Sequence, residues 1–205
     1  MTLEGASCRI RRLRRADLPV DTIELARYLI GKTLVHDMAR GRISGRIIET
    51  EAYPPGDAAA HHFRGLTARN RSLFLQRGLA YVFFTYGSSY MMNVASEKPG
   101  VGAGVLIRAL EPLEGIELMN RHRGTTRLLD LARGPGRLAA ALRIDKRYDG
   151  IDLCARGPLW LGTSVKDAVP LGCSVRIGIT REAKRAWRFY ERGCAYVSGP
   201  KQIRT

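Results

Sequence analysis

The sequence predicts an α+β fold, in which one domain has a mainly antiparallel β-sheet, flanking helices and a protruding β-hairpin. Its 205 residues are 45% hydrophobic, enough for one sizeable core without calling for a second. Strand-like runs at 32–38 and 42–53 are joined by a short turn, as in an antiparallel pair. Helical patterns lie before the first strand and after the later ones.

The first element is expected to be a short amphipathic helix. Asp21 and Glu24 form a capping-box pattern, apolar residues follow at helical spacing, and Gly31 ends the helix. The two paired strands come directly after it.

The second strand, 42–53, carries two glutamates in the stretch RIIETEAY. Side chains alternate between the faces of a strand, which predicts one face for a set containing both carboxylates. That set is Ile43, Ile47, Glu49, Glu51 and Tyr53. Periodicity gives no preference between the two glutamates as a functional group.

A long ordered loop is expected over 54–72, since its turn residues, small residues and arginines have no apolar period. Residues 79–96 then show two strand-like runs joined at Gly87, which predicts a hairpin with Tyr86 and Tyr90 flanking its tip.

The last third of the chain alternates strands and helices. A strand at 105–110 places Arg108 inside an apolar run, where a guanidinium needs a partner. Helices are expected at 114–124 and 134–144, and further strands with a helix between 174 and 198.

The charge of the chain indicates a polyanionic partner. Its formal net charge is +15, from 34 basic and 19 acidic residues, and only six of the basic residues are lysine. Arginine has the planar fork that pairs well with phosphate, so nucleic acid is the natural candidate.

Neither the cysteines nor the apolar runs of the sequence match a known targeting, disulfide or zinc-binding motif. Four separated cysteines form no zinc or disulfide pattern, and no apolar run fits a signal peptide or a membrane span. Residues 1–18 are predicted to be a basic N-terminal arm, for which a disordered tail is favoured over a phosphate contact or a transit peptide, and residues 19–205 are the domain.

Two readings of the polar residues remain open. A metal-dependent nuclease could use Glu49, Glu51 and Asp57, but the spacing is a thin basis for a metal site, and neither a metal nor a cofactor is expected. The alternative is a general-base carboxylate beside flat aromatic walls, which suit a nucleobase that has left its duplex.

Eight motifs then carry a resemblance over residues 20 to 200. In order they are LARYLIGKTLV, GRIIETEAY, DAAAHHFRG, TARNRSLF, YVFFTYGSSYMMNV, VLIRALEPLEG, GPGRLAAAL and RFYERGCAYVS. The chain resembles the alkyladenine DNA glycosylase family, the 3-methyladenine or N-methylpurine DNA glycosylases of base-excision repair.

The resemblance implies a role for each matched residue. It makes Glu51, rather than Glu49, the catalytic general base, and Tyr86 the residue that intercalates into DNA. The implied base-binding pocket consists of Tyr53, His61, Phe83, Asn93 and Arg108. Phe83 departs from the pattern, because tyrosine is common there; His62 matches no role and is expected to be structural.

The implied function is that of a monofunctional DNA glycosylase acting on alkylated or deaminated purines. The implied partner is double-stranded DNA with damaged purines, with no membrane involved and a monomer expected. The location would be cytoplasmic and nucleoid-associated in a bacterium, or nuclear in a eukaryote. A catalytically silent DNA-binding domain of the same fold remains the alternative.

Overall fold

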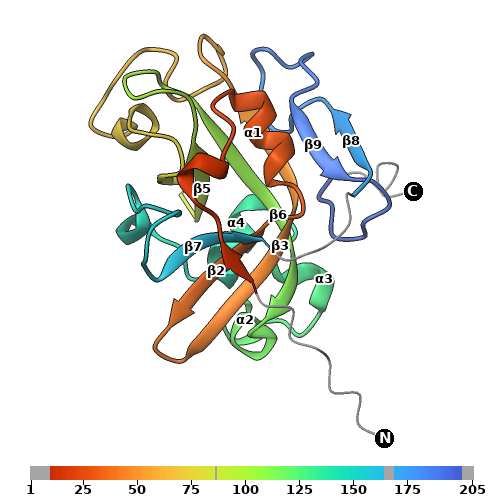
Figure 1. Cartoon of the computed structure of the whole chain (residues 1–205). Helices are drawn as coiled ribbons and strands as arrows, with labels where there is room; N and C mark the ends of the chain where they lie inside the picture. Colours follow the sequence, from red (N-terminus) through yellow and green to blue (C-terminus); the bar gives the residue numbers. More distant parts are fainter. Residues whose placement is uncertain (1–9, 86, 164–168, 200–205) are drawn as a thin grey trace, which may run out of the picture.

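The computed structural model describes residues 10–85, 87–163 and 169–199. Within these ranges nine strands form one open sheet in the order β1-β7-β2-β3-β6-β5-β4, and β9 pairs with both β3 and β8. All pairings between these strands are antiparallel. The predicted α+β class with a mainly antiparallel sheet is therefore confirmed (Figure 1).

The strands and helices have the following bounds. The strands are β1 (Arg11–Arg12), β2 (Thr33–Met38), β3 (Gly41–Tyr53), β4 (Ala80–Thr85), β5 (Ser89–Ala95), β6 (Gly104–Glu114), β7 (Leu159–Thr163), β8 (Leu171–Ser174) and β9 (Arg188–Glu191). The α-helices are α1 (Thr22–Leu29), α2 (Ile116–Arg123), α3 (Leu128–Leu131) and α4 (Pro135–Ala141).

Helix α1 forms where its capping pattern predicted it. The carboxylate of Asp21 accepts hydrogen bonds from the backbone N–H groups of Ile23 and Glu24, which stabilises the helix start. Its apolar stripe, including Leu25 and Leu29, is fully buried against the sheet. The hydroxyl of Thr50 on β3 donates to a carbonyl of the helix and fixes the two elements together.

One face of the sheet forms the main core. Buried residues of all four helices share a single hydrophobic cluster with alternate residues of the central strands. Val82 of β4, Val94 of β5 and Ile107 of β6 belong to it, so their neighbours along each strand face the other side. That other side carries the pocket described below.

The predicted alternation along β3 is wrong in one respect. In the pairing of β3 with β6, Ile48 has no partner on β6 and Arg108 has none on β3, so each strand has a bulge at this point. Ile43 and Ile47 therefore lie in the main core, whereas Glu49 and Glu51 lie on the opposite face. An extra residue shifts the alternation by one position, which no period-two pattern shows.

The ends of the chain also differ from expectation. Strand β7, between β1 and β2, was not anticipated, and the region 174–198 contains the last residue of β8 and the short strand β9, without the expected helix. Of the N-terminal arm, Leu13 and Leu18 are buried, and β1 pairs with β7. Residues 1–9 lie outside the described residues, so the extent of the arm stays a prediction. No helix in the described ranges has the length and apolar character needed to cross a bilayer.

Candidate active site

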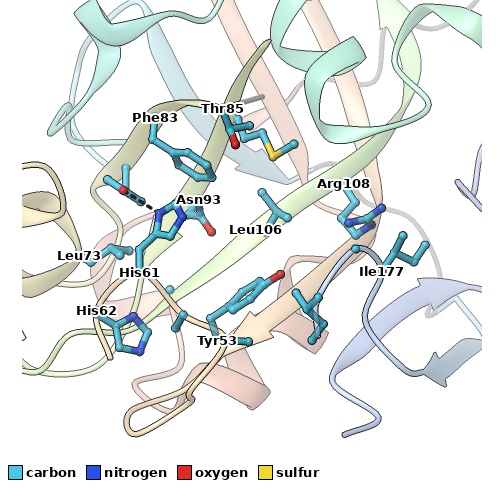
Figure 2. Close-up of a pocket in the computed structure, with 17 residues that line it drawn as sticks. Tyr53, His61, His62, Leu73, Phe83, Thr85, Asn93, Leu106, Arg108 and Ile177 are labelled. Carbon is cyan, nitrogen blue, oxygen red and sulfur yellow. Dashed lines mark hydrogen bonds between the residues drawn. The ribbon is translucent and has the colours of Figure 1, made fainter. Parts of the chain in front are cut away.

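A pocket with a volume of about 200 Å³ lies on the face of the sheet opposite the main core (Figure 2). Strands β3 to β6, the loop after β3 and the segment after β8 all contribute to it. Its lining comprises Tyr53, Ala59, Ala60, His61, His62, Leu73, Tyr81, Phe83, Thr85, Met91, Asn93, Gly104, Leu106, Arg108, Ile177, Gly178 and Ile179.

Aromatic rings form two sides of the pocket. In Figure 2 the ring of Tyr53 faces the space on one side, and His61 and Phe83 lie across from it. The rings of His61 and Phe83 meet edge to face with centroids 4.4 Å apart, and Tyr81 stacks on Phe83 at 5.2 Å. Both geometries are favourable for aromatic pairs, so this wall is held by its own contacts.

His61 is further held by a hydrogen bond between its Nδ1 and the hydroxyl of Tyr81, 3.0 Å long. Burial, reinforced by the nearby Arg69, lowers the pKa of His61, so the imidazole is neutral near pH 7. Burial also raises the pKa of Tyr81 to about 12, which keeps its hydroxyl protonated. The wall therefore presents an uncharged face to a ligand.

The side chain of Glu51 is fully buried and contacts two residues of the pocket lining, Tyr53 and Arg108. Its Oε1 accepts from the backbone N–H of Ile177 at 2.8 Å and lies 3.1 Å from Nη1 of Arg108. Its Oε2 accepts one hydrogen bond, from the hydroxyl of Tyr53 at 2.9 Å. Two hydrogen bonds and the ion pair with Arg108 thus orient the carboxylate, which does not itself line the pocket but contacts the lining residues Tyr53, Arg108 and Ile177.

Two of these groups, Tyr53 and Arg108, have shifted pKa values. Burial, and then the negative charge of Glu51, raise the pKa of Tyr53, so its phenol remains a donor at all ordinary pH values. Burial alone would lower the pKa of Arg108, but Glu51 and Glu49 more than offset this and raise it. Glu51 therefore lies between a protonated phenol and a charged guanidinium.

Glu49 has a different environment. Its Oε1 accepts from Nε of Arg108, from Nε of Arg188 and from the hydroxyl of Ser198, and its Oε2 accepts from the Ser198 backbone N–H. The residue is fully buried and does not line the pocket. Its hydrogen bonds tie β3, β6, β9 and the segment after β9 together.

The remaining matched residues are placed as follows. Asn93 of β5 is 7% exposed, and in Figure 2 its amide points into the space between His61 and Tyr53. Arg108 projects from the β6 bulge, a feature that often re-aims side chains at functional sites. Tyr86 lies outside the described residues. The structure therefore brings Glu51, Arg108 and the aromatic residues to one place, although they come from separate parts of the chain.

Asp57 is part of a buried ion pair with Arg176 and not of a cluster of carboxylates. Arg176 donates to both carboxylate oxygens of Asp57, and its guanidinium lies 4.6 Å from the centre of the Tyr53 ring. The three acidic residues of the nuclease alternative are each engaged by arginine, which disfavours a cation. In the described ranges no group of three or more histidine, cysteine or acidic residues could hold a metal ion.

Several groups in and beside the pocket were missed by the sequence reasoning. The backbone N–H of Ile177 and the guanidinium of Arg176 come from a segment expected only to be a strand. An arginine inside the apolar run SVRIGI was the one available signal, because such a group needs a buried partner. His62, expected to be structural, bonds the Pro54 carbonyl through Nε2 at 3.0 Å and also lines the pocket.

Comparisons with known proteins give a consistent result. A family model described as Methylpurine-DNA glycosylase (MPG) matches residues 16–195. A protein of Mesorhizobium japonicum is 63% identical over 191 residues, which cover 93% of this chain and 92% of that relative. One of Paraburkholderia phytofirmans is 53% identical over 191 residues, 93% of this chain and 90% of the relative. Both relatives bear the name "Putative 3-methyladenine DNA glycosylase".

Proposed function

Since this chain belongs to the methylpurine-DNA glycosylase family, we propose that it flips alkylated or deaminated purines out of duplex DNA and excises them. Family membership makes it a DNA glycosylase, a hydrolase of N-glycosyl bonds whose substrate is DNA. The proposal adds the substrate class, the flipped state of the base and the residues that carry the reaction.

The flipped purine would lie between Tyr53 on one side and Phe83 with His61 on the other. Flat, uncharged walls of this kind suit a nucleobase, which an enzyme can reach only outside the stack. Asn93 would contact the edge of the base and discriminate against the exocyclic amine of guanine. Tyr86 would fill the space left in the duplex, as wedge residues do in other proteins that bind the minor groove.

The chemical step would be direct hydrolysis. Glu51 would take a proton from a water molecule as the water oxygen forms a bond to C1′ of the flipped nucleotide. The C1′–N bond breaks, and its electron pair leaves with the purine. A cationic alkylated purine then departs as a neutral base, whereas hypoxanthine needs a proton from an acid or from solvent.

The observation that carries this proposal is the orientation of Glu51. Its Oε2 accepts only the Tyr53 hydroxyl among the described residues, which leaves a lone pair free for a proton. Arg108 and the Ile177 N–H hold the other oxygen, so the carboxylate is fixed in direction while it reacts.

The test is single-turnover base release from duplex DNA carrying one hypoxanthine or 7-methylguanine, in EDTA. Wild type should release the base and leave an intact abasic strand; Glu51→Gln should bind the lesion yet lose roughly 100-fold or more in rate. Glu117→Gln, a surface glutamate of α2, is the matched control and should behave as wild type. No release by wild type across a lesion panel would instead support the silent DNA-binding domain.

A further inference from the structure

We propose that Glu49 is a positioning residue for Glu51. Glu49 binds part of the Arg108 guanidinium, so that one oxygen of Glu51 stays free of contact with Arg108. This inference rests on the proposed function of Glu51. It concerns a residue that does not line the pocket and that shares one arginine with the proposed base.

The guanidinium of Arg108 is shared among three partners. A guanidinium pairs best with a carboxylate through two parallel N–H bonds, which would occupy both carboxylate oxygens. Here Nε of Arg108 is 2.9 Å from Glu49, Nη1 is 3.1 Å from Glu51, and Nη2 donates to the Ser198 hydroxyl at 3.4 Å. The nitrogens of Arg108 are therefore shared among Glu49, Glu51 and Ser198 instead of forming a two-bond pair with Glu51.

Glu49 can hold Arg108 in this way because it is itself fixed. Arg188 is 2% exposed and donates to Glu49 at 2.6 Å, and its other nitrogens donate to Ser174 and to the Ser198 carbonyl. Glu49 accepts three hydrogen bonds at Oε1 and one, from the Ser198 backbone N–H, at Oε2, so both of its oxygens are held in place.

The buried charges alternate along this cluster, from Arg188 to Glu49 to Arg108 to Glu51. Positive and negative charges are equal in number, which a buried cluster requires. The other group that bonds Glu51 from its own strand is the Tyr53 hydroxyl, which is uncharged. The nearby Arg176 is paired with Asp57.

Without the charge of Glu49, two effects act in the same direction. Glu51 loses a neighbouring negative charge, and Arg108 becomes free to bind both of its oxygens. Each favours the ionised form of Glu51 and makes it a weaker acceptor of a proton.

The experiment is the pH profile of the single-turnover rate for wild type and Glu49→Gln. In the variant the acidic limb should move to lower pH by about one unit or more. The plateau rate should fall roughly tenfold, less than for loss of a general base, and lesion binding should be retained. Glu111→Gln, in the ion pair of Arg46 with Glu111 between the same two strands, is the matched control and should keep the wild-type profile.

A second variant guards against a folding defect. Glu49→Gln with Arg188→Met removes one anion and one cation, so the cluster stays balanced while Arg108 still lacks Glu49. This double variant should also show the shifted limb. An unshifted limb in a folded double variant would overturn the proposal, as would a loss in Glu49→Gln as complete as in Glu51→Gln. If wild type released no base, or if Glu51→Gln were fully active, the proposed function itself would fail.

Discussion

The hydroxyl of Tyr53 donates a 2.9 Å hydrogen bond to Oε2 of Glu51, from two positions along the same strand. One side chain therefore both forms an aromatic wall of the pocket and contacts the proposed base. Because the pKa of Tyr53 is raised by burial and by Glu51, this donor stays protonated throughout the working pH range. The wall and the carboxylate act as one unit.

Tyr53→Phe should separate these two roles. The ring that faces the pocket is kept, while Glu51 loses a donor that favours its ionised form. The acidic limb of the rate profile should therefore move to higher pH, opposite to the change expected for Glu49→Gln. The measurement is the single-turnover rate from about pH 5 to pH 8. Tyr28→Phe on α1 is the control, and an unchanged limb in Tyr53→Phe would show that the hydrogen bond does not influence the base.

The ion pair of Arg176 with Asp57 should be important for stability. Both side chains are fully buried, so Arg176→Met leaves an unpaired carboxylate in the interior and should cost about 3–5 kcal/mol of unfolding free energy. Adding Asp57→Asn removes that charge and should recover much of the loss, because the amide oxygen can still cap the Ala59 N–H. Urea unfolding measures both.

The control for this pair is Arg147→Met, which breaks an exposed pair with Asp145 and should cost at most about 1 kcal/mol. Equal, small losses in Arg176→Met and Arg147→Met would mean that the buried pair is not needed for folding.

How far the sequence predicts this fold can be seen along β3. Capping and apolar spacing located α1 and the two strands after it, because these are local signals. The bulges at Ile48 and Arg108 arise from the pairing of two strands far apart in sequence, so a period-two pattern placed the glutamates on the wrong face. Strand β7 was missed for a related reason: it is defined by its pairing with β2, a strand far away in the sequence.

For the site, the motifs located most of the residues that the structure brings together, from Tyr53 to Arg108. They did not locate the Ile177 N–H, because a backbone donor carries no side-chain signature. Nor did they separate Glu49 from Glu51 without the family resemblance. The two differ in the long-range partners that surround them, and spacing along the strand contains no information about those.

Buried histidines should make the protein less stable in mild acid. Burial lowers the pKa of His36, His61 and His62, so the unfolded chain binds more protons than the native one as the pH falls below about 6.5. Unfolding free energy should therefore fall with decreasing pH in this range, by up to about 1.4 kcal/mol per pH unit for each histidine.

Urea unfolding at several pH values measures this slope, and His36→Gln should reduce it by the contribution of one proton. His36 is suited to the test because it lies outside the pocket, between the Leu142 carbonyl and the Tyr148 hydroxyl. A stability that stays constant from about pH 7 to pH 5.5 would contradict the assignment of neutral buried histidines.

Phe83 and Phe84 provide a test of the pocket against general DNA binding. They are neighbours on β4, but Phe83 lines the pocket beside His61, whereas Phe84 lies outside it, is 48% exposed and packs on Tyr90. Stacking of a base on an aromatic ring contributes about 1–3 kcal/mol, so Phe83→Ala should weaken binding to lesion DNA roughly 5- to 150-fold relative to undamaged DNA. Phe84→Ala, by contrast, should change the two affinities by the same factor, because its ring does not line the pocket.

Phe83→Tyr should retain the selectivity of wild type for binding, since it keeps the stacking face. The measurement is the ratio of dissociation constants for lesion and undamaged duplexes at one salt concentration, and equal ratios in Phe83→Ala and wild type would remove Phe83 from the base-binding wall.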